Sequence, residues 1–181
     1  MRLALVGLDE DTKTVIAEHL RNHYGFAIEG LFRALSKPLA DDMAAATEEL
    51  EIAPVVWHNT IAQAMRSALG PEPFLLALAS RLAADDAPDD IVVTDGYYES
   101  DLRTLQALGF LAIAVTSANT HTNVHEDPFA WHQSTNWFGA INNGGNLSHL
   151  HQQIFTLVSL VAETQGSASA GVRQGLQNYR G

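Results

Sequence analysis

The sequence predicts an α/β domain with a short, mostly parallel sheet flanked by helices. Two observations lead to this prediction. Short apolar runs without polar alternation, at residues 3–6, 91–94 and 111–115, are typical of strands that are buried on both faces. Amphipathic segments separate these runs, as the crossover connections of a parallel sheet require. Such sheets bind their ligands at the carboxyl ends of the strands, where Gly7 and Asp95 stand.

The first half of the chain contains one strand and several helical patterns. After the strand at residues 3–6, apolar residues recur at helical spacing from Thr14 onward, and Gly25 stands where a helix commonly ends. Further helices are predicted at 31–50, where Pro38 interrupts the pattern, at 61–69 and at 75–82.

The second half continues the alternation of strands and helices. The strand at 91–94 stops at Asp95-Gly96, and a helix over about residues 100–108 precedes the strand at 111–115. Residues 117–137 are polar and aromatic without a clear period, so we expect a lid or a surface loop. The remaining elements are a short strand at 138–141, the turn Asn142-Asn143-Gly144-Gly145 and a closing helix at 147–161.

The end of the chain differs in composition from the rest. We expect one domain over residues 1–163 and a low-complexity tail over 164–181, where Gln, Gly, Ser and Ala dominate and no apolar face is left to bury. Alone, the tail should be disordered. We expect it to dock on a partner, either a second copy of the chain or an assembly component.

The composition is that of an acidic globular protein. Of 181 residues, 46% are hydrophobic, which is enough for a core. The net charge of −11 disfavours nucleic acids and anionic membranes as partners. The lack of cysteine excludes disulfides and thiolate zinc sites. Because no apolar run is long enough for a secretory core or a membrane span, we expect a cytoplasmic protein.

The segment after the first strand has the layout of a phosphate-binding loop. Gly7, Lys13 and Thr14 keep the spacing of that motif, with a strand before them and a helix after. In such a loop, backbone N–H groups point at the phosphates, the lysine reaches them and the hydroxyl ligates magnesium. Thr12 stands where the motif has a second glycine.

Three acids in this segment support a second interpretation. Asp9, Glu10 and Asp11 place negative charge beside the phosphates, and Lys13 is the one cation nearby in sequence. Acids are also favourable at the positive end of a helix. The segment is therefore either a phosphate loop or a plain turn between a strand and a helix.

Three more segments resemble, together with this loop, the phage-type deoxynucleoside monophosphate kinases. They are Met65–Gly70, Ile91–Leu102 and Ala140–Leu147, and the likeness spans roughly residues 1–160. The resemblance implies a P-loop NTPase-like fold and phosphoryl transfer from ATP, with Mg²⁺, to a (deoxy)nucleoside monophosphate. It also implies residence in a host cytoplasm if a phage encodes the chain.

By position in the family motifs, the resemblance implies a role for each matching residue. Gly7, Lys13 and Thr14 match the donor-phosphate loop, with Lys13 catalytic and Thr14 on the magnesium ion. Asp95 matches an acid that orders the magnesium shell or the acceptor site. Asn142, Asn143 and Gly144 match a turn near the donor base.

The cations that could bind the acceptor phosphate are few. Arg33 and Lys37 are one helical turn apart, and we keep Arg33 and Arg66 as candidate acceptor contacts; solvated surface charge is the alternative. Tyr97 replaces the family's arginine, and no Lys or Arg occurs between Arg103 and Arg173. Because phosphoryl transfer depends on cations, a second hypothesis is an inactive kinase-fold protein with a structural or interaction role, such as phage assembly.

Other polar and aromatic residues gather in the last third of the chain. His121 and His125, with Glu126 or Asp127, could form a metal site or could be loop histidines that only form hydrogen bonds. His149 and His151 cannot face each other on a helix. The aromatic residues either stack on a nucleobase, cover the edge of the sheet or bury against a second subunit; they are Phe129, Trp131, Trp137 and Phe138.

Overall fold

The computed structural model describes residues 1–7, 10–46, 54–70, 72–95, 99–117, 136–166 and 169–180. The chain divides into two compact units, one formed by Met1–Glu29 with Pro88–Gly181 and the other by Gly30–Ala87. This division differs from the expected single domain over 1–163, because the helical segment between the second and third strands packs mainly on itself. Among the described residues, no helix has both the length and the apolar character needed to cross a membrane.

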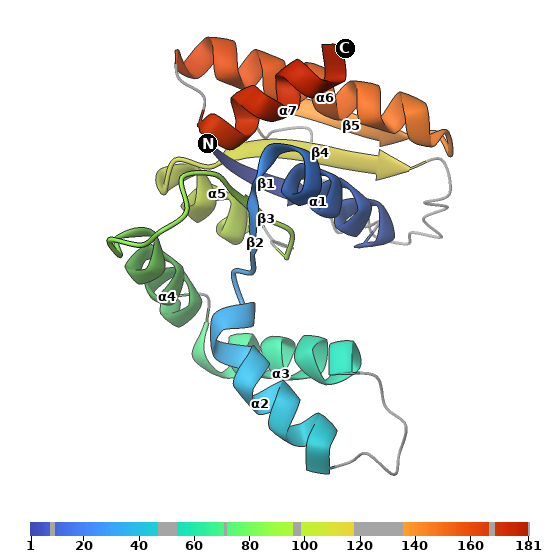
Figure 1. Ribbon diagram of the computed structural model, residues 1–181. Helices are drawn as coiled ribbons and strands as arrows, with labels where there is room; N and C mark the ends of the chain where they lie inside the picture. The colour runs from blue at the N-terminus through green and yellow to red at the C-terminus, as the bar shows by residue number, and fades with distance from the viewer. Residues whose placement is uncertain are drawn as a thin grey trace. The chain divides into compact units, whose positions relative to one another are not determined.

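The first unit contains a five-stranded sheet in which every neighbouring pair is parallel (Figure 1). This confirms the predicted α/β class with a parallel sheet between helices. The order is β2-β3-β1-β4-β5. The strands are β1 (Arg2–Val6), β2 (Ala27–Glu29), β3 (Ile91–Val93), β4 (Leu111–Ser117) and β5 (Gly139–Asn143). The sequence prediction missed β2, because three residues are too few to display a period.

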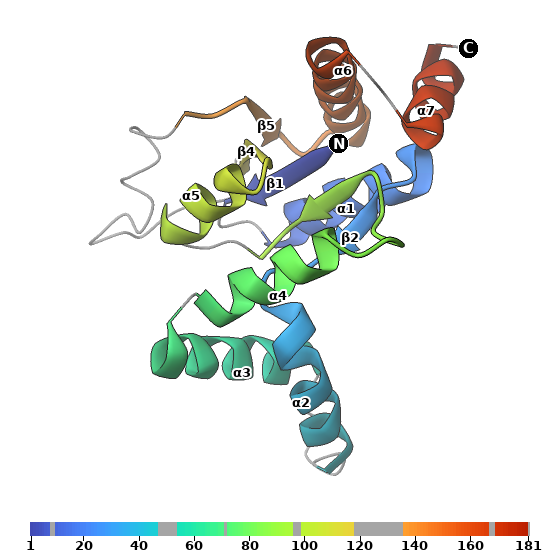
Figure 2. The same cartoon turned by 90° about the vertical axis from the view of Figure 1, so that its left-hand side faces the viewer.

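Helices cover both faces of this sheet. On one face, α1 (Glu10–Tyr24), α6 (Leu147–Gln165) and α7 (Ala170–Arg180) pack on Leu3 and Leu5 of β1 and on Ile113 of β4. The opposite face presents Val6 and Ala112, which pack with Leu102 of α5 (Glu99–Ala107) (Figure 2). Alternate residues of β1 thus face different helices, as the pleat of a strand dictates.

The two described aromatic residues before β5 belong to the packing of the sheet. Trp137 lies against Val6 and Ala112, and Phe138 is partly buried against the core on the opposite face. Their place agrees with the structural alternative predicted for this segment. Phe129 and Trp131 lie outside the described residues, as does the candidate metal site around His121 and His125.

The C-terminal segment forms a helix that docks on its own chain, which corrects the expectation of a disordered tail. Helix α7 packs on the end of α1, where a Cβ atom on Gly171 or Gly175 would overlap the backbone carbonyls of Tyr24 and His23. Two glycines four residues apart therefore let the helices approach closely. Val172 is fully buried at this contact. Leu176 is partly buried against the same core, and Tyr179 stacks on Phe155 of α6, so Val172, Leu176 and Tyr179 form an apolar stripe that the sequence prediction missed.

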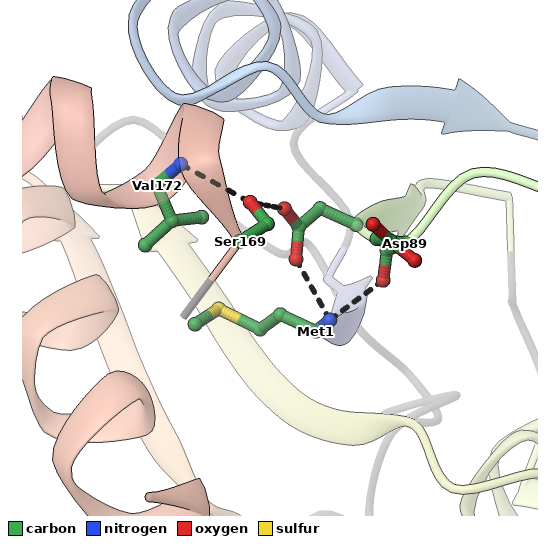
Figure 3. Close-up of polar contacts among 5 residues, drawn as sticks. Met1, Asp89, Ser169 and Val172 are labelled. Carbon is green, nitrogen blue, oxygen red and sulfur yellow. Dashed lines mark hydrogen bonds and ion pairs between the residues drawn. The ribbon is translucent and has the colours of Figure 1, made fainter. Parts of the chain in front are cut away.

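A polar network anchors the start of α7 (Figure 3). The N-terminal ammonium group of Met1 lies 2.7 Å from Oδ1 of Asp90, and it also donates to the carbonyl oxygen of Asp89. The other carboxylate oxygen of Asp90 accepts from Ser169, whose Oγ in turn accepts from the backbone N–H of Val172. This network joins the beginnings of β1, β3 and α7, and Ser169 acts as the cap of the helix.

The second unit is helical and contains α2 (Arg33–Ala46), α3 (Pro54–Leu69) and α4 (Glu72–Leu82). Pro38 was expected to interrupt the first of these helices, but α2 continues through it. The ring of Phe32 meets that of Phe74 edge to face at 4.8 Å between centroids. Arg81 donates to the carbonyl oxygen of Gly30. These contacts give the unit its own small core.

Candidate functional site

The candidate site lies in the first unit, at the edge where the parallel strands end. Gly7 follows β1, Asp95 lies two residues beyond β3, and Asn143 is the last residue of β5. Because all five strands run the same way, these three residues belong to one edge of the sheet. Residues 8 and 9 of the connecting turn lie outside the described residues.

Gly7 has a structural reason to be glycine. A Cβ atom at this position would overlap the backbone carbonyl oxygen of Val115 in the neighbouring strand β4. The glycine therefore lets β1 and β4 run close together at their carboxyl ends. Its presence in the motif does not by itself require a phosphate.

The helix after β1 begins earlier than the phosphate-loop motif suggested. The prediction started it at Thr14, whereas α1 begins at Glu10, so Thr12 and Lys13 lie in its first turn. First-turn N–H groups lack partners within a helix and carry the positive end of its dipole. An anion is favoured there, but Glu10 and Asp11 already bring two carboxylates to this turn.

Lys13 forms an ion pair within that turn. Its Nζ lies 2.6 Å from Oε1 of Glu10, three residues earlier, which is a spacing that brings side chains together on a helix. The lysine is 0% exposed, whereas Glu10 is 52% exposed. The candidate phosphate-binding ammonium is thus buried and already contacts an anion that the chain itself supplies.

Thr12, the position that departs from the motif, has a structural role. It is 2% exposed, and its Oγ1 accepts a hydrogen bond of 2.8 Å from Nδ2 of Asn143. Oδ1 of Asn143 accepts from the backbone N–H of Gly145. The threonine therefore connects the first turn of α1 to the turn after β5, a connection that a glycine could not make.

Asn142 is held differently from its neighbour. Its backbone N–H donates to Oε1 of Gln153 at 2.9 Å, and its carbonyl oxygen accepts from Nε2 of the same side chain at 2.8 Å. The Gln153 amide thus pairs with the outer edge of β5 as a neighbouring strand would. The two asparagines that were predicted together support different elements, α6 and α1.

The other predicted site residues divide between the two units. Thr14 is exposed on α1, and Asp95 is half-buried after β3. Arg33 begins α2 and Arg66 lies in α3, so both candidate acceptor contacts belong to the helical unit. The guanidinium of Arg66 lies 5.3 Å from the centre of the Phe32 ring. The side chains of Arg33 and Lys37 lie outside the described residues.

The residues of α1 fit a phosphate group under one condition. Lys13 supplies an ammonium and Thr14 an accessible hydroxyl, which are the donor types that a nucleotide phosphate and its magnesium ion require. A phosphate that reaches Lys13 must first displace Glu10, whose half-exposed side chain has room to turn toward water. Within the described part of the chain, no group of three or more His, Asp or Glu could hold a metal ion.

A histidine cluster lies on the same helix as Lys13. The ring of His19 stacks on that of His151 from α6 at 4.0 Å and lies 4.3 Å from that of His23. Burial, and then the charges that His151 and His23 would carry, lower the pKa of His19 to about 4. Burial and His23 also lower the pKa of His151. The spacing of His19 and His23, four residues apart, was the overlooked sequence signal.

A shallow hollow of about 390 Å³ lies between β5 and α6. Its lining includes Gly139, His149, Gln152, Gln153, Leu157 and Leu160. None of the predicted site residues lines it, although Gln153 also holds Asn142. The hollow is therefore distinct from the α1 site.

The site thus consists of a helix first turn with an internal ion pair, tied to the turn after β5 and placed at the carboxyl edge of a parallel sheet. Two of the segments that the sequence motifs singled out meet in space through the hydrogen bond between Asn143 and Thr12. Comparisons with family models, with curated proteins and with solved structures find no match to this chain.

Proposed function

We propose that the protein is a nucleotide-binding protein of the deoxynucleoside monophosphate kinase type, with its phosphate site in the first turn of α1. One observation carries the proposal. Thr12 and Asn143 are 131 residues apart, yet they are joined by a hydrogen bond of 2.8 Å. The two segments that resemble the donor-phosphate loop and the donor-base turn of such kinases are therefore neighbours, as a shared nucleotide site requires.

In this proposal, the residues at the carboxyl ends of the strands and at the start of α1 have distinct roles. Lys13 contacts the donor phosphates after Glu10 has moved, and the exposed hydroxyl of Thr14, the next residue of α1, supplies a ligand for the magnesium shell. Asp95 orders that shell or the acceptor, and Asn142 and Asn143 border the donor base. Thr14 and Asp95 would hold the magnesium ion, which would supply positive charge to the phosphoryl group that passes from ATP to the monophosphate.

The architecture supports the finer assignment to a P-loop NTPase-like fold. The strand order is compatible with such a fold, and β1 runs directly into the helix that carries Lys13 and Thr14. A helical unit is inserted between β2 and β3, and both candidate acceptor arginines, Arg33 and Arg66, belong to it.

A second candidate function is favoured by the ion pair at the site. Lys13 is fully buried against Glu10, and the hydroxyl of Thr12 is engaged by Asn143. If these contacts persist in the presence of nucleotide, the chain keeps a kinase-like fold without catalysis and acts as a structural or interaction component. Binding measurements separate the two candidates, and product analysis then tests for catalysis.

Thermal unfolding with and without nucleotide tests the proposal. Millimolar MgATP should raise the unfolding temperature of the original protein, because a ligand that binds the folded state stabilises it. The increase should disappear in Lys13→Ala. It should persist in Arg21→Ala, which removes a positive charge from an exposed position of the same helix. No increase at millimolar MgATP, or an equal increase in Lys13→Ala, would contradict a phosphate site at Lys13.

Catalysis needs its own measurement. The protein should be incubated with MgATP and each deoxynucleoside monophosphate in turn, and the diphosphate products should be separated and quantified. Binding with transfer to one monophosphate supports the kinase. Binding without diphosphate formation from any of them supports the second candidate.

A further inference from the structure

We propose that Glu10 is an internal competitor for Lys13, and that its carboxylate controls the access of phosphate groups to the site. This inference rests on the proposed function, since it assigns regulation to the same site. The ion pair between the two side chains, one turn apart at the start of α1, carries it. Access to the site then depends on the exchange of one anion for another.

The two partners have opposite environments. Lys13 is 0% exposed, and a buried ammonium is stable only where an anion or acceptors compensate its lost hydration. Glu10 is 52% exposed, so it can turn into water without repacking the core. The lysine must keep an anionic partner, but the glutamate is free to leave. A pair of this kind can exchange its exposed member for an external anion.

Asp11, the acid next to Glu10, differs from Glu10 in its position relative to Lys13. Asp11 lies in the same first turn and is exposed, so it contributes similar charge to the positive end of the helix. It is only two residues before Lys13, and residues two apart do not face each other on a helix. The proposed control of phosphate access is therefore due to the contact between Glu10 and Lys13, and not to the negative charge of the turn as a whole.

The competition also defines which ligands can bind. A singly charged anion gains little by replacing a carboxylate that is tethered one turn away. A pyrophosphate or a nucleotide polyphosphate carries more charge and more acceptor oxygens, and it can contact Lys13 together with the first-turn N–H groups. The arrangement thus favours polyphosphate groups over carboxylates and single small anions.

The first test is calorimetric titration with inorganic pyrophosphate at constant ionic strength. Glu10→Gln keeps the shape of the side chain and removes its charge, and Asp11→Asn is the matched control with the same change in net charge. Glu10→Gln should bind pyrophosphate about fivefold or more tightly than the original protein, as expected when a partly exposed ion pair is removed as a competitor. Asp11→Asn should change the affinity less than about twofold at 0.15 M salt.

A second measurement follows Lys13 without any phosphate. The sequence has two lysines, Lys13 and Lys37, so Lys37 is an internal reference for amine labelling by reductive methylation and peptide mass spectrometry. Glu10→Gln should raise the labelling of Lys13 relative to Lys37 severalfold, because the neutral amide no longer attracts the ammonium by charge. Asp11→Asn should leave the ratio unchanged.

The outcomes separate the inference from the function on which it rests. Unchanged labelling of Lys13 in Glu10→Gln overturns the control by Glu10. Pyrophosphate binding by the original protein without a gain in Glu10→Gln, or with an equal gain in Asp11→Asn, overturns it as well. Faster labelling without pyrophosphate or MgATP binding in any variant overturns the proposed function together with the inference. Faster labelling and tighter binding in Glu10→Gln alone support both.

Discussion

The two ends of α1 differ in how they are held. At the first turn, single polar contacts dominate, namely the Glu10–Lys13 ion pair and the hydrogen bond between Asn143 and Thr12. At the last turn, backbone meets backbone, because the glycines of α7 lie against the carbonyls of His23 and Tyr24. Exposed polar partners can be exchanged for a ligand, whereas close backbone packing cannot. The first turn is therefore the end of α1 that is suited to binding.

The largest expected effect is at the packed end. Gly175→Ala places a methyl group where it would overlap the carbonyl oxygen of His23. Helix α7 must then move away from α1, and we expect a loss of about 3 kcal/mol in the free energy of unfolding. Urea unfolding measures it.

Gly144→Ala is the control for that substitution, because no heavy atom lies within 4 Å of the Cβ position at Gly144. It should be nearly neutral. Equal stability of the two variants would show that α7 is not closely packed on α1, and the contrast between the two ends of the helix would fail.

Protonation of His19 is the second way to test the packed end. Its pKa is lowered from 6.5 to about 4, so between these values the unfolded chain binds a proton that the folded protein does not. Stability should therefore be complete above pH 6.5 and fall as the pH drops toward 4, by on the order of 2 kcal/mol from this residue. Unfolding free energies at pH 7 and 4.5 measure the change.

The matched comparison is between two histidine variants. His19→Gln removes the buried ring that stacks on His151, and it should reduce the loss of stability between pH 7 and 4.5. His149→Gln removes an exposed histidine of α6 and should leave that loss unchanged. An identical pH dependence in all three proteins would contradict the assignment to His19.

The sequence was sufficient to predict those strands and helices that show a clear hydrophobic periodicity. Continuous apolar runs located β1, β3 and β4, and helical spacing located most of α1 and α6. Helical spacing also marks Val172, Leu176 and Tyr179 of α7, but the close contact with α1 depends on two glycines, whose role can be recognised only once the two helices are side by side. Hydrophobic periodicity shows which face of a single helix or strand is buried. It does not show the contacts between two elements, which are the features that the prediction missed.

The site shows the same limit. The spacing of Gly7, Lys13 and Thr14 singled out the segment from the end of β1 to the start of α1, but three residues of that segment have roles that spacing does not encode. Gly7 avoids a carbonyl of β4, and Thr12 accepts from Asn143, 131 residues away. Glu10 was considered as a charge that repels phosphate or that favours the positive end of a helix, whereas the start of α1 at this residue places it one turn before Lys13, as its ion-pair partner.

The smallest expected effect concerns the exchangeable end of α1. Thr12→Val keeps the shape of the side chain but leaves the amide of Asn143 without its acceptor, and a lost hydrogen bond of this kind costs about 1 kcal/mol. Thr116→Val, at an exposed position of β4, should change the free energy of unfolding by less than half as much. Urea unfolding of both variants measures the difference. A loss in Thr12→Val as large as that in Gly175→Ala would mean that the first turn is as rigidly built as the last, and an exchange of Glu10 for phosphate would then lose its structural basis.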